Sequence, residues 1–522
     1  MADPKWQEDT ELASTDDSNK YESKRITSTP VDQNEELIDT RQVDLALTRK
    51  MILVNAAIDE VGMTPFHWKL FVLNGFGYGA DNLLVLCQSV SQSPVTQQFG
   101  NPSKHITGIS MASQVGLLVG AALWGISADI VGRRLAFNSS FFICAVFVLI
   151  AGAMPNYISF AAMVAIYSAA NGGNYILDTT NLVEFLPVSH SWLTTFLAVW
   201  WAVGYTITGL LAWAFLGNYS CHSDVTICTN RDNMGWRYLH FTCGGLITLL
   251  AILRVFVIRM PQTPKWLITQ NRDSEAFDLL KNIADCYNRP FSLTLQQLEE
   301  PGHVLNSEKS VWSSVRLKKH FSDLFATRRL AYSIFVISLN WFLIGIVSPL
   351  YTVYLPYYLA SRGADTGSDD STYITWRNYA INQSCGLIGP IIAGGLVETK
   401  YLGRRGTLAV GAAITTALQF GYTQIKTSLQ NVAISAAITA GGNIYYSTLY
   451  AYTPEVFPSA HRATGYGLCV IINRIGGVIA ILIGSYANVN TTAPLFVCAS
   501  LYAILVLTSL MLPLETRGKR FA

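Results

Sequence analysis

Long apolar runs, each near the length that crosses a lipid bilayer, recur along most of the chain. A helix needs about 20 mostly apolar residues to span the hydrocarbon core. Runs of this length predict twelve membrane-spanning helices, near residues 67–90, 106–128, 135–154, 158–186, 191–216, 236–259, 331–360, 376–399, 407–425, 429–452, 461–486 and 492–512. No soluble fold hides that many such runs, so the pattern predicts an all-α membrane protein.

Polar stretches divide the chain into five parts. Residues 1–65 are polar and acidic and lack an apolar targeting segment, which predicts a disordered cytosolic tail. Residues 66–260 hold six of the apolar runs, and residues 331–512 hold the other six. Between them, residues 261–330 are expected to form a polar cytosolic linker with short helices, and residues 513–522 a short cytosolic tail.

Lys and Arg residues near the span ends predict the orientation in the membrane, because cytosolic loops carry an excess of these residues. Arg133-Arg134, Arg404-Arg405 and the linker at 261–330 place basic residues on one side. That side is assigned to the cytosol, and the plasma membrane is the expected location of this multi-pass chain.

Two loops on the opposite side carry the Asn-x-Ser/Thr pattern of glycosylation, at Asn218 and Asn490. Cys221 and Cys228 share the first of these loops. An oxidising compartment would favour a disulfide between them, but the sequence alone leaves this pairing open.

Composition agrees with the apolar pattern, since apolar residues make up 51% of the chain and charged residues 13%. The formal net charge is +2, and no basic block interleaved with aromatic residues points to nucleic acid. No catalytic or metal-ligand spacing is present either. We therefore expect neither an enzyme nor a bound cofactor or metal.

An internal repeat relates the two sets of six runs. Gly132-Arg133-Arg134 recurs as Gly403-Arg404-Arg405, 271 residues later (403 minus 132). Glu184-Phe185-Leu186-Pro187 recurs as Glu455-Val456-Phe457-Pro458 at the same offset (455 minus 184). Such matches in corresponding loops predict two pseudo-symmetric halves of six helices each.

A ten-residue segment lies between the second and third predicted spans. Its Gly-x-x-x-Asp-x-x-Gly-Arg-Arg pattern is formed by Gly125, Asp129, Gly132, Arg133 and Arg134. This segment resembles the signature loop of the major facilitator superfamily of transporters. The resemblance implies twelve helices in two halves and the transport of a small solute.

Other segments resemble the sugar-porter subgroup of that superfamily. Glu455 and Arg462 repeat its Glu-x6-Arg pattern, whereas Ser191 stands where the first half would hold the equivalent Arg. Asn340-Trp341-Phe342 replaces the double glutamine of hexose carriers. Asn473-Arg474-Ile475-Gly476 is similar to a segment of organic-anion carriers. The resemblance is thus closer to the branch that holds organic-ion carriers, synaptic-vesicle-like proteins and fungal relatives.

The resemblance also implies a charge cluster that steadies one conformation at the cytosolic face and breaks in another. Its expected members come from both halves: Gly125, Asp129, Gly132, Arg133, Arg134, Glu184, Arg404, Arg405, Glu455 and Arg462. Within it, Glu184 is expected to pair with Arg133 or Arg134.

Charged residues at bilayer depth are costly and tend to mark solute or proton pathways. Asp81 lies near the middle of the first span, where a carboxylate held away from water can exchange a proton. Asn171, Asn174 and Asp178 share one face of the fourth span, directed at a central cavity. We expect Asp81 and Asp178 to couple proton movement, and Asn171 and Asn174 to bind solute. The alternative for Asp81 is a fixed hydrogen bond or ion pair.

Two arginines lie within apolar runs. Arg474 is central in the eleventh span and keeps its charge, so it needs an anion nearby. Asp81, Asp178 or the solute could supply that anion, and the sequence leaves this choice open. Arg254 lies near a span end and is expected to extend to the membrane surface.

Aromatic residues are the last candidates for solute contact. Tyr351, Tyr446 and Trp201 are expected to line a cavity for a planar or ringed solute, with Asn340 as a further polar contact. The alternative for such rings is helix packing or an aromatic belt at the membrane surface.

These features predict a secondary active transporter that moves a small organic solute, an organic anion or carboxylate, by proton-coupled alternating access. A sugar or polyol carrier is the near alternative, and a non-transporting membrane receptor or sensor is the distant one. The expected partners are the solute, protons and the lipid bilayer, and the chain is expected to function as a monomer.

Overall fold

The computed structural model describes residues 45–100, 108–131, 133–221, 228–257, 261–304, 325, 327–361, 372–425, 427–457, 462–486 and 493–518. The regular elements of these residues are helices. Residues Asp44–Ala522 form one compact unit that contains all of them.

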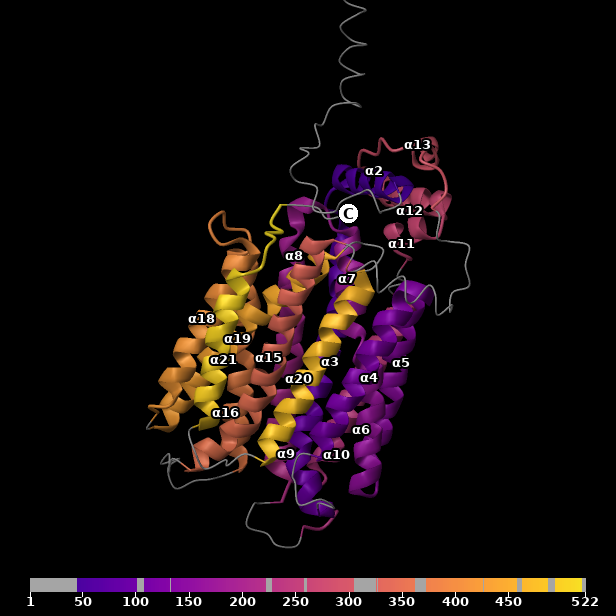
Figure 1. Cartoon of the computed structure of the whole chain (residues 1–522). Helices are drawn as coiled ribbons and strands as arrows, with labels where there is room; N and C mark the ends of the chain where they lie inside the picture. The colour runs from indigo at the N-terminus through magenta and orange to yellow at the C-terminus, as the bar shows by residue number, and fades with distance from the viewer. Residues whose placement is uncertain are drawn as a thin grey trace, which may run out of the picture. The chain divides into compact units, whose positions relative to one another are not determined.

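The apolar runs of the first half form helices or broken helix pairs (Figure 1). In chain order these are α3 (Pro65–Phe99), α4 (Gly108–Val131), α5 (Arg133–Gly152), α6 (Tyr157–Asn171) with α7 (Asn174–Phe185), α8 (Trp192–Phe196) with α9 (Ala198–Tyr219), and α10 (Gly235–Ile252) with η3 (Leu253–Val257). The turn η2 (Val188–His190) joins α7 to α8.

The second half repeats this arrangement (Figure 1). Its helices are α15 (Arg328–Ser361), α16 (Thr372–Cys385) with α17 (Ile388–Leu396), α18 (Gly403–Tyr422), α19 (Ser428–Val456), α20 (Arg462–Tyr486) and α21 (Ala493–Leu510). Among the described residues, 7 helices are long and apolar enough to cross a membrane by themselves. The remaining predicted spans are shorter, more polar or interrupted.

A pair of glycines interrupts the fourth span of the first half. Gly172 and Gly173 separate α6 from α7, and a Cβ on Gly173 would lie 2.1 Å from the Cβ of Trp124 in α4. The absence of side chains therefore lets α4 pass close to the break. The equivalent Gly441 and Gly442 lie inside the continuous α19, so the halves share this motif but not the break.

The two halves meet along two helix pairs, α4 with α20 and α9 with α16. The first pair crosses at Gly125 and Gly467, where a Cβ on Gly125 would lie 3.0 Å from the Cα of Gly467. Gly125 of the signature segment thus permits a close helix crossing between the halves. Because α4 and α16 occupy equivalent places in the repeat, as do α9 and α20, the two contacts are related by the pseudo-symmetry.

Four short helices gather at one end of the bundle, which we call the linker side (Figure 1). They are α2 (Leu45–Val61), α11 (Pro264–Thr269), α12 (Asp273–Cys286) and α13 (Leu295–Glu299). The sequence predicts a disordered tail as far as residue 65, and for Leu45–Val61 that prediction is wrong. Met51, Val54 and Ile58 form an apolar stripe that packs against Leu267 and Leu280 of the linker.

Polar contacts fasten α2 in two directions. The buried Lys50 ammonium group pairs with Asp273 at the start of α12. Asp59 Oδ1 accepts a hydrogen bond of 2.9 Å from the Val188 amide in the turn between α7 and α8. The helix therefore ties the linker to the first half.

The crossing of α3 and α9 gives a direct test of the packing. A Cβ on Gly204 would lie 2.1 Å from the carbonyl oxygen of Gly79, whereas a Cβ on Gly245 would meet nothing within 4 Å. We expect Gly204→Ala to force the helices apart at a cost of about 1–3 kcal/mol. The control Gly245→Ala should be neutral or slightly stabilising, because alanine favours helix. Thermal unfolding of the two purified variants measures this difference, and equal midpoints would contradict the close approach.

Candidate functional site

Asp81 of α3 is fully buried near the middle of its helix, within a small polar shell. Its Oδ1 accepts a 3.0 Å hydrogen bond from Asn174 Nδ2, and its backbone oxygen accepts one of 3.3 Å from Asn171 Nδ2. Ser140 Oγ in turn donates to Asn174 Oδ1 at 2.8 Å. Both asparagines, expected from the sequence to bind solute, therefore position Asp81. Among the described residues, no group hydrogen-bonds Asp81 Oδ2.

Asp178 of α7 lies in a separate, ionic arrangement. Its Oδ1 lies 2.6 Å from Arg254 Nη2 in η3, and both side chains are fully buried. The guanidinium group also stacks over the Phe141 ring, 4.7 Å from its centroid. Gly77 of α3 makes room for the carboxylate, because a Cβ there would lie 1.7 Å from Asp178 Oδ2.

This ion pair corrects the expectation for Arg254. Arg254 does not extend to the membrane surface but lies inside the protein, with 1% of its surface exposed. Asp178 is bound to this permanent cation, and its part in proton movement stays a prediction. The sequence signal for Arg254 was its charge inside an apolar run, but its partner lies on another helix.

Arg474 of α20 is half-buried between the halves. Its Nε is shielded from solvent and has no hydrogen-bond partner among the described residues. The described salt bridges do not include it, although its charge acts on Asp81, Tyr175, Tyr205, Tyr446 and Tyr450. Among the described residues, Arg474 is thus a cation without a carboxylate bonded to it.

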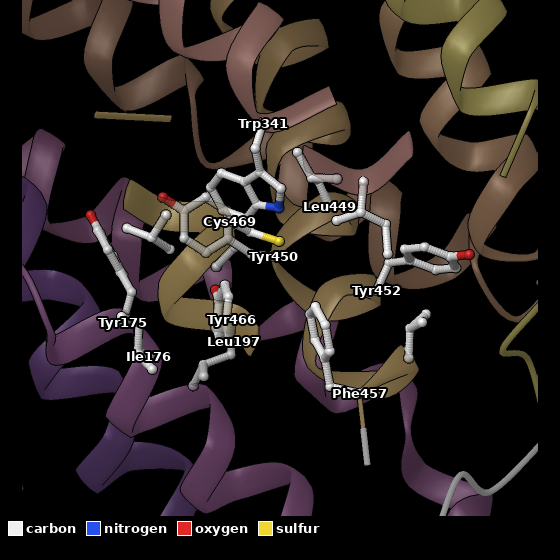
Figure 2. Packing of buried hydrophobic residues seen from close by; sticks show 14 of the residues in the cluster. Tyr175, Ile176, Leu197, Trp341, Leu449, Tyr450, Tyr452, Phe457, Tyr466 and Cys469 are labelled. Carbon is white, nitrogen blue, oxygen red and sulfur yellow. The ribbon is translucent and has the colours of Figure 1, made fainter. Parts of the chain in front are cut away.

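Tyr175, Tyr446 and Tyr450 belong to a larger group at the boundary of the two halves, which we call the boundary aromatic cluster. Figure 2 labels four of its members, Tyr175, Trp341, Tyr450 and Tyr466. Its members are Tyr78, Tyr175 and Trp201 from the first half, and Trp341, Tyr446, Tyr450 and Tyr466 from the second. Tyr450 connects the two sets, with its ring centroid 5.0 Å from that of Trp201 and 4.6 Å from that of Trp341. The cluster joins the halves, and its member Tyr466 lies on α20, the helix that also carries Arg474.

Two predicted solute contacts lie outside this cluster. The Asn340 amide is engaged by helix packing, because its Nδ2 donates to the Val336 carbonyl and its Oδ1 accepts from Tyr445 and Thr508 at 2.8 and 2.9 Å. Tyr351 lies against Tyr422 of α18, with ring centroids 6.3 Å apart. By contrast, Trp201 and Tyr446 do lie together, 5.2 Å apart.

Ion pairs also join elements on the linker side. Glu184 Oε1 of α7 lies 3.5 Å from Arg462 Nη1 of α20, so this pair bridges the halves. Glu455 instead binds Arg404 of its own half, with Oε1 2.8 Å from Nη2 and Oε2 3.1 Å from Nε. Arg404 Nη2 also donates to Ser191 Oγ of the first half at 3.3 Å.

Several members of the expected charge cluster are placed differently or are not placed. The backbone amides of Arg404 and Arg405 donate to the Glu515 carboxylate at 2.8 and 3.1 Å. Gly132 and the side chains of Asp129, Arg133 and Arg134 lie outside the described residues. The partner described for Glu184 is Arg462, where the sequence suggested Arg133 or Arg134.

The loop after α9 contains the disulfide that the sequence left open, between Cys221 and Cys228. Asn218 is exposed just before it, and its Nδ2 donates to the Ala214 carbonyl at 2.9 Å. The other glycosylation pattern, at Asn490, lies outside the described residues. In the described part of the chain, no group of three His, Cys, Asp or Glu side chains could hold a metal ion.

The sequence of this chain is similar to those of known proteins. A sequence profile of the Major Facilitator Superfamily matches residues 70–481. The MFS siderochrome iron transporter 1 of Ceriporiopsis subvermispora is 37% identical, over 96% of this chain and 98% of its own. The major facilitator-type transporter hxnZ of Emericella nidulans is 38% identical, over 90% of this chain and 87% of its own.

Two more distant likenesses extend this result. The synaptic vesicle 2-related protein of Rattus norvegicus is 23% identical over 90% of this chain and 82% of its own. The solved structure of the proton:xylose symporter XylE superposes with a TM-score of 0.65 at 14% identity, over 87% of this chain and 98% of that one. The twelve-helix, two-half arrangement predicted from the sequence is confirmed as this fold.

The buried pair of Asp178 and Arg254 can be tested through its asymmetry. We expect Arg254→Gln or Asp178→Asn alone to destabilise the protein by about 3–5 kcal/mol, because each leaves one buried charge without its partner. The double substitution removes both charges and should recover most of the loss. Thermal unfolding of the purified variants measures these effects. Additive losses in the double variant would mean that the two side chains act independently.

Proposed function

The chain belongs to the Major Facilitator Superfamily and is a membrane transporter, and from this premise we propose that it moves a small organic anion together with protons. The proposed solute is a carboxylate on a planar ring. It binds between the halves, beside Arg474 and the boundary aromatic cluster, and crosses the membrane by alternating access.

The observation that carries this proposal is Arg474. A permanent cation between two membrane-embedded halves needs an anion, and none of the described carboxylates forms a salt bridge with it. A solute carboxylate supplies the missing charge in the bidentate geometry that a guanidinium group favours. We place the body of the solute against the rings of Trp201, Tyr446 and Tyr450, which favour a flat apolar body over a polyhydroxylated one.

Asp81 is the proposed proton carrier. Its Oδ2 is free to take a proton, while its Oδ1 and backbone are held by the two asparagines. We propose that the permanent charge of Arg474 also acts on Asp81. A bound anion cancels that charge, so solute binding and proton binding favour each other and the two move together.

Alternating access requires contacts that hold one state and break in the other. The boundary aromatic cluster and the pair of Glu184 with Arg462 join the halves in the state described. We assign the aromatic cluster and the ion pair to this role. We assign the hydrogen bond from Arg404 to Ser191 to it as well. Solute entry from the linker side would have to separate these groups.

The same proposal places the linker side in the cytosol and the protein, as a monomer, in the plasma membrane. The basic span ends support this orientation, since Arg404 and Arg405 lie on the linker side. The disulfide at Cys221 and Cys228 lies in the opposite loop, which fits an oxidising exterior. Asn218 beside it is the proposed glycosylation site.

The relatives' names do not agree on a solute, because one specifies siderochrome iron and a structural neighbour specifies xylose. A direct binding test separates the classes. We expect benzoate to raise the unfolding temperature of the purified protein, whereas benzamide, of the same shape without the charge, and xylose should not. Stabilisation by xylose alone would favour the sugar alternative. Binding without flux in vesicles would favour a receptor.

Coupling is tested at Asp81. We expect Asp81→Asn to abolish solute accumulation driven by a pH gradient, because the amide cannot carry the proton. Solute exchange should persist, since Arg474 and the rings are untouched. Flux of labelled solute into proteoliposomes measures both quantities, and Asp285→Asn, an exposed change on α12, serves as the matched control. Unchanged accumulation in the Asp81 variant would remove this residue from the mechanism.

Charge recognition is tested at Arg474. We expect Arg474→Lys to weaken carboxylate binding by about tenfold or more, because a charged bidentate hydrogen bond contributes roughly 1.5–3 kcal/mol. Expression and unfolding temperature should match those of the unmodified protein. The exposed Arg272→Lys, at the residue before α12, is the control. If Arg474→Lys instead lowers stability and leaves affinity intact, the guanidinium group serves an internal structural role.

A further inference from the structure

A groove runs along the outside of the bundle where the two halves meet at α9 and α16. Its volume is about 330 Å³, and its walls include Leu210 and Trp213 of the first half with Arg377, Ile381 and Ile388 of the second. Leu210, Ile381 and Ile388 are 47%, 44% and 49% exposed. Apolar side chains exposed on membrane-crossing helices face hydrocarbon, so this groove opens to lipid.

Two hydrogen-bond donors lie in the same groove. Arg377, on the first turns of α16, is exposed, and its described hydrogen bond is a 3.3 Å contact to the neighbouring Asn378. The indole Nε1 of Trp213 is shielded and has no acceptor among the described residues. The Trp213 ring lies beside Tyr373, with centroids 5.5 Å apart. A cation and a free indole donor next to apolar side chains suit the binding of an amphipathic anion.

We propose that this groove between α9 and α16 is a binding site for an anionic phospholipid of the leaflet opposite the linker side. Arg377 binds the headgroup phosphate, and Trp213 donates to an ester oxygen. One acyl chain lies along Leu210, Ile381 and Ile388.

The dimensions and the chemistry agree with this occupant. Ile388 follows Arg377 by 11 residues, which places it roughly 16 Å further along the helices. That direction leads from the membrane surface toward its middle, as an acyl chain runs. Arginine suits phosphate through its paired donors, and tryptophan is enriched at the level of the headgroups. The transported solute is a poor occupant, because the groove opens to the outside of the bundle and is lined mainly by apolar side chains.

Because the groove lies between the two halves, a bound lipid would affect how the halves pack. Its walls belong to different halves, and they approach closely at Gly209, where a Cβ would lie 3.2 Å from the Cα of Ala380. Rocking of one half against the other changes this contact. A lipid held by both walls therefore binds the described packing better and stabilises it.

Native mass spectrometry of the full-length protein, delipidated and then titrated with phosphatidylglycerol, tests the proposal. We expect the unmodified chain to retain one more lipid than Arg377→Gln, with about tenfold weaker binding in the variant. Ile381→Trp, which fills the groove but keeps the charge, should lose the same lipid. Arg272→Gln, which removes a charge at the residue before α12, should retain it. Phosphatidylcholine should be held less tightly than phosphatidylglycerol at this site.

Three results would overturn the site. Equal retention by the unmodified chain and both groove variants would show that no lipid is held there. Equal retention of the two lipids would show that Arg377 does not select the anionic headgroup. If inorganic phosphate raises the unfolding temperature as much as phosphatidylglycerol does, the groove holds a free anion and not a lipid. Each readout is independent of the transported solute.

Discussion

The cost of holding charge away from water organises this molecule. Ionised groups inside a membrane-embedded bundle must find partners, since an unpaired one costs several kcal/mol. Asp178 and Arg254 satisfy this constraint together, and their contact in turn requires a glycine at position 77. Against that background, the open oxygen of Asp81 and the unbonded guanidinium group of Arg474 stand out. Under the proposed function, a solute and a proton would supply what these two groups lack.

The two halves differ at a position of the internal repeat that contributes to the contact between them. Glu184 is equivalent to Glu455, and Ser191 is equivalent to Arg462, at the offset of 271 residues. Full symmetry would provide two ion pairs across the halves, one from each glutamate. The serine replaces the second pair by a hydrogen bond to Arg404, while Glu455 turns to Arg404 within its own half. On the linker side, an ion pair therefore joins the halves at one position, and a single hydrogen bond joins them at the equivalent position.

Much of the fold could be predicted because its signals are local. Each apolar run has the length of a span, and the repeat offset identifies the halves without any knowledge of contacts. Helix α2 was missed because its apolar stripe is short and lies in a polar region, so its burial depends on linker residues far along the chain.

The site was predictable only in part for the same reason. Asp81, Trp201 and Tyr446 could be selected as polar or aromatic residues at bilayer depth, and the structure brings all three to the boundary region. Pairing could not be predicted, since Asp178 and Arg254 are 76 residues apart and lie on different helices. The Asn340 amide resembled a ligand in sequence, yet its own helix and two neighbouring helices supply its hydrogen-bond partners.

The packing of α2 against the linker also determines when this contact can form during synthesis of the chain. Lys50 and its partner Asp273 are separated by 223 residues of chain. At about 5–20 residues per second of synthesis, α2 waits roughly 10–45 seconds for its partner to leave the ribosome. Throughout that interval six spans enter the membrane while the apolar stripe of α2 has no partner within the nascent chain. This contact can therefore form only after the first half and the start of the linker, as far as Asp273, have been synthesised.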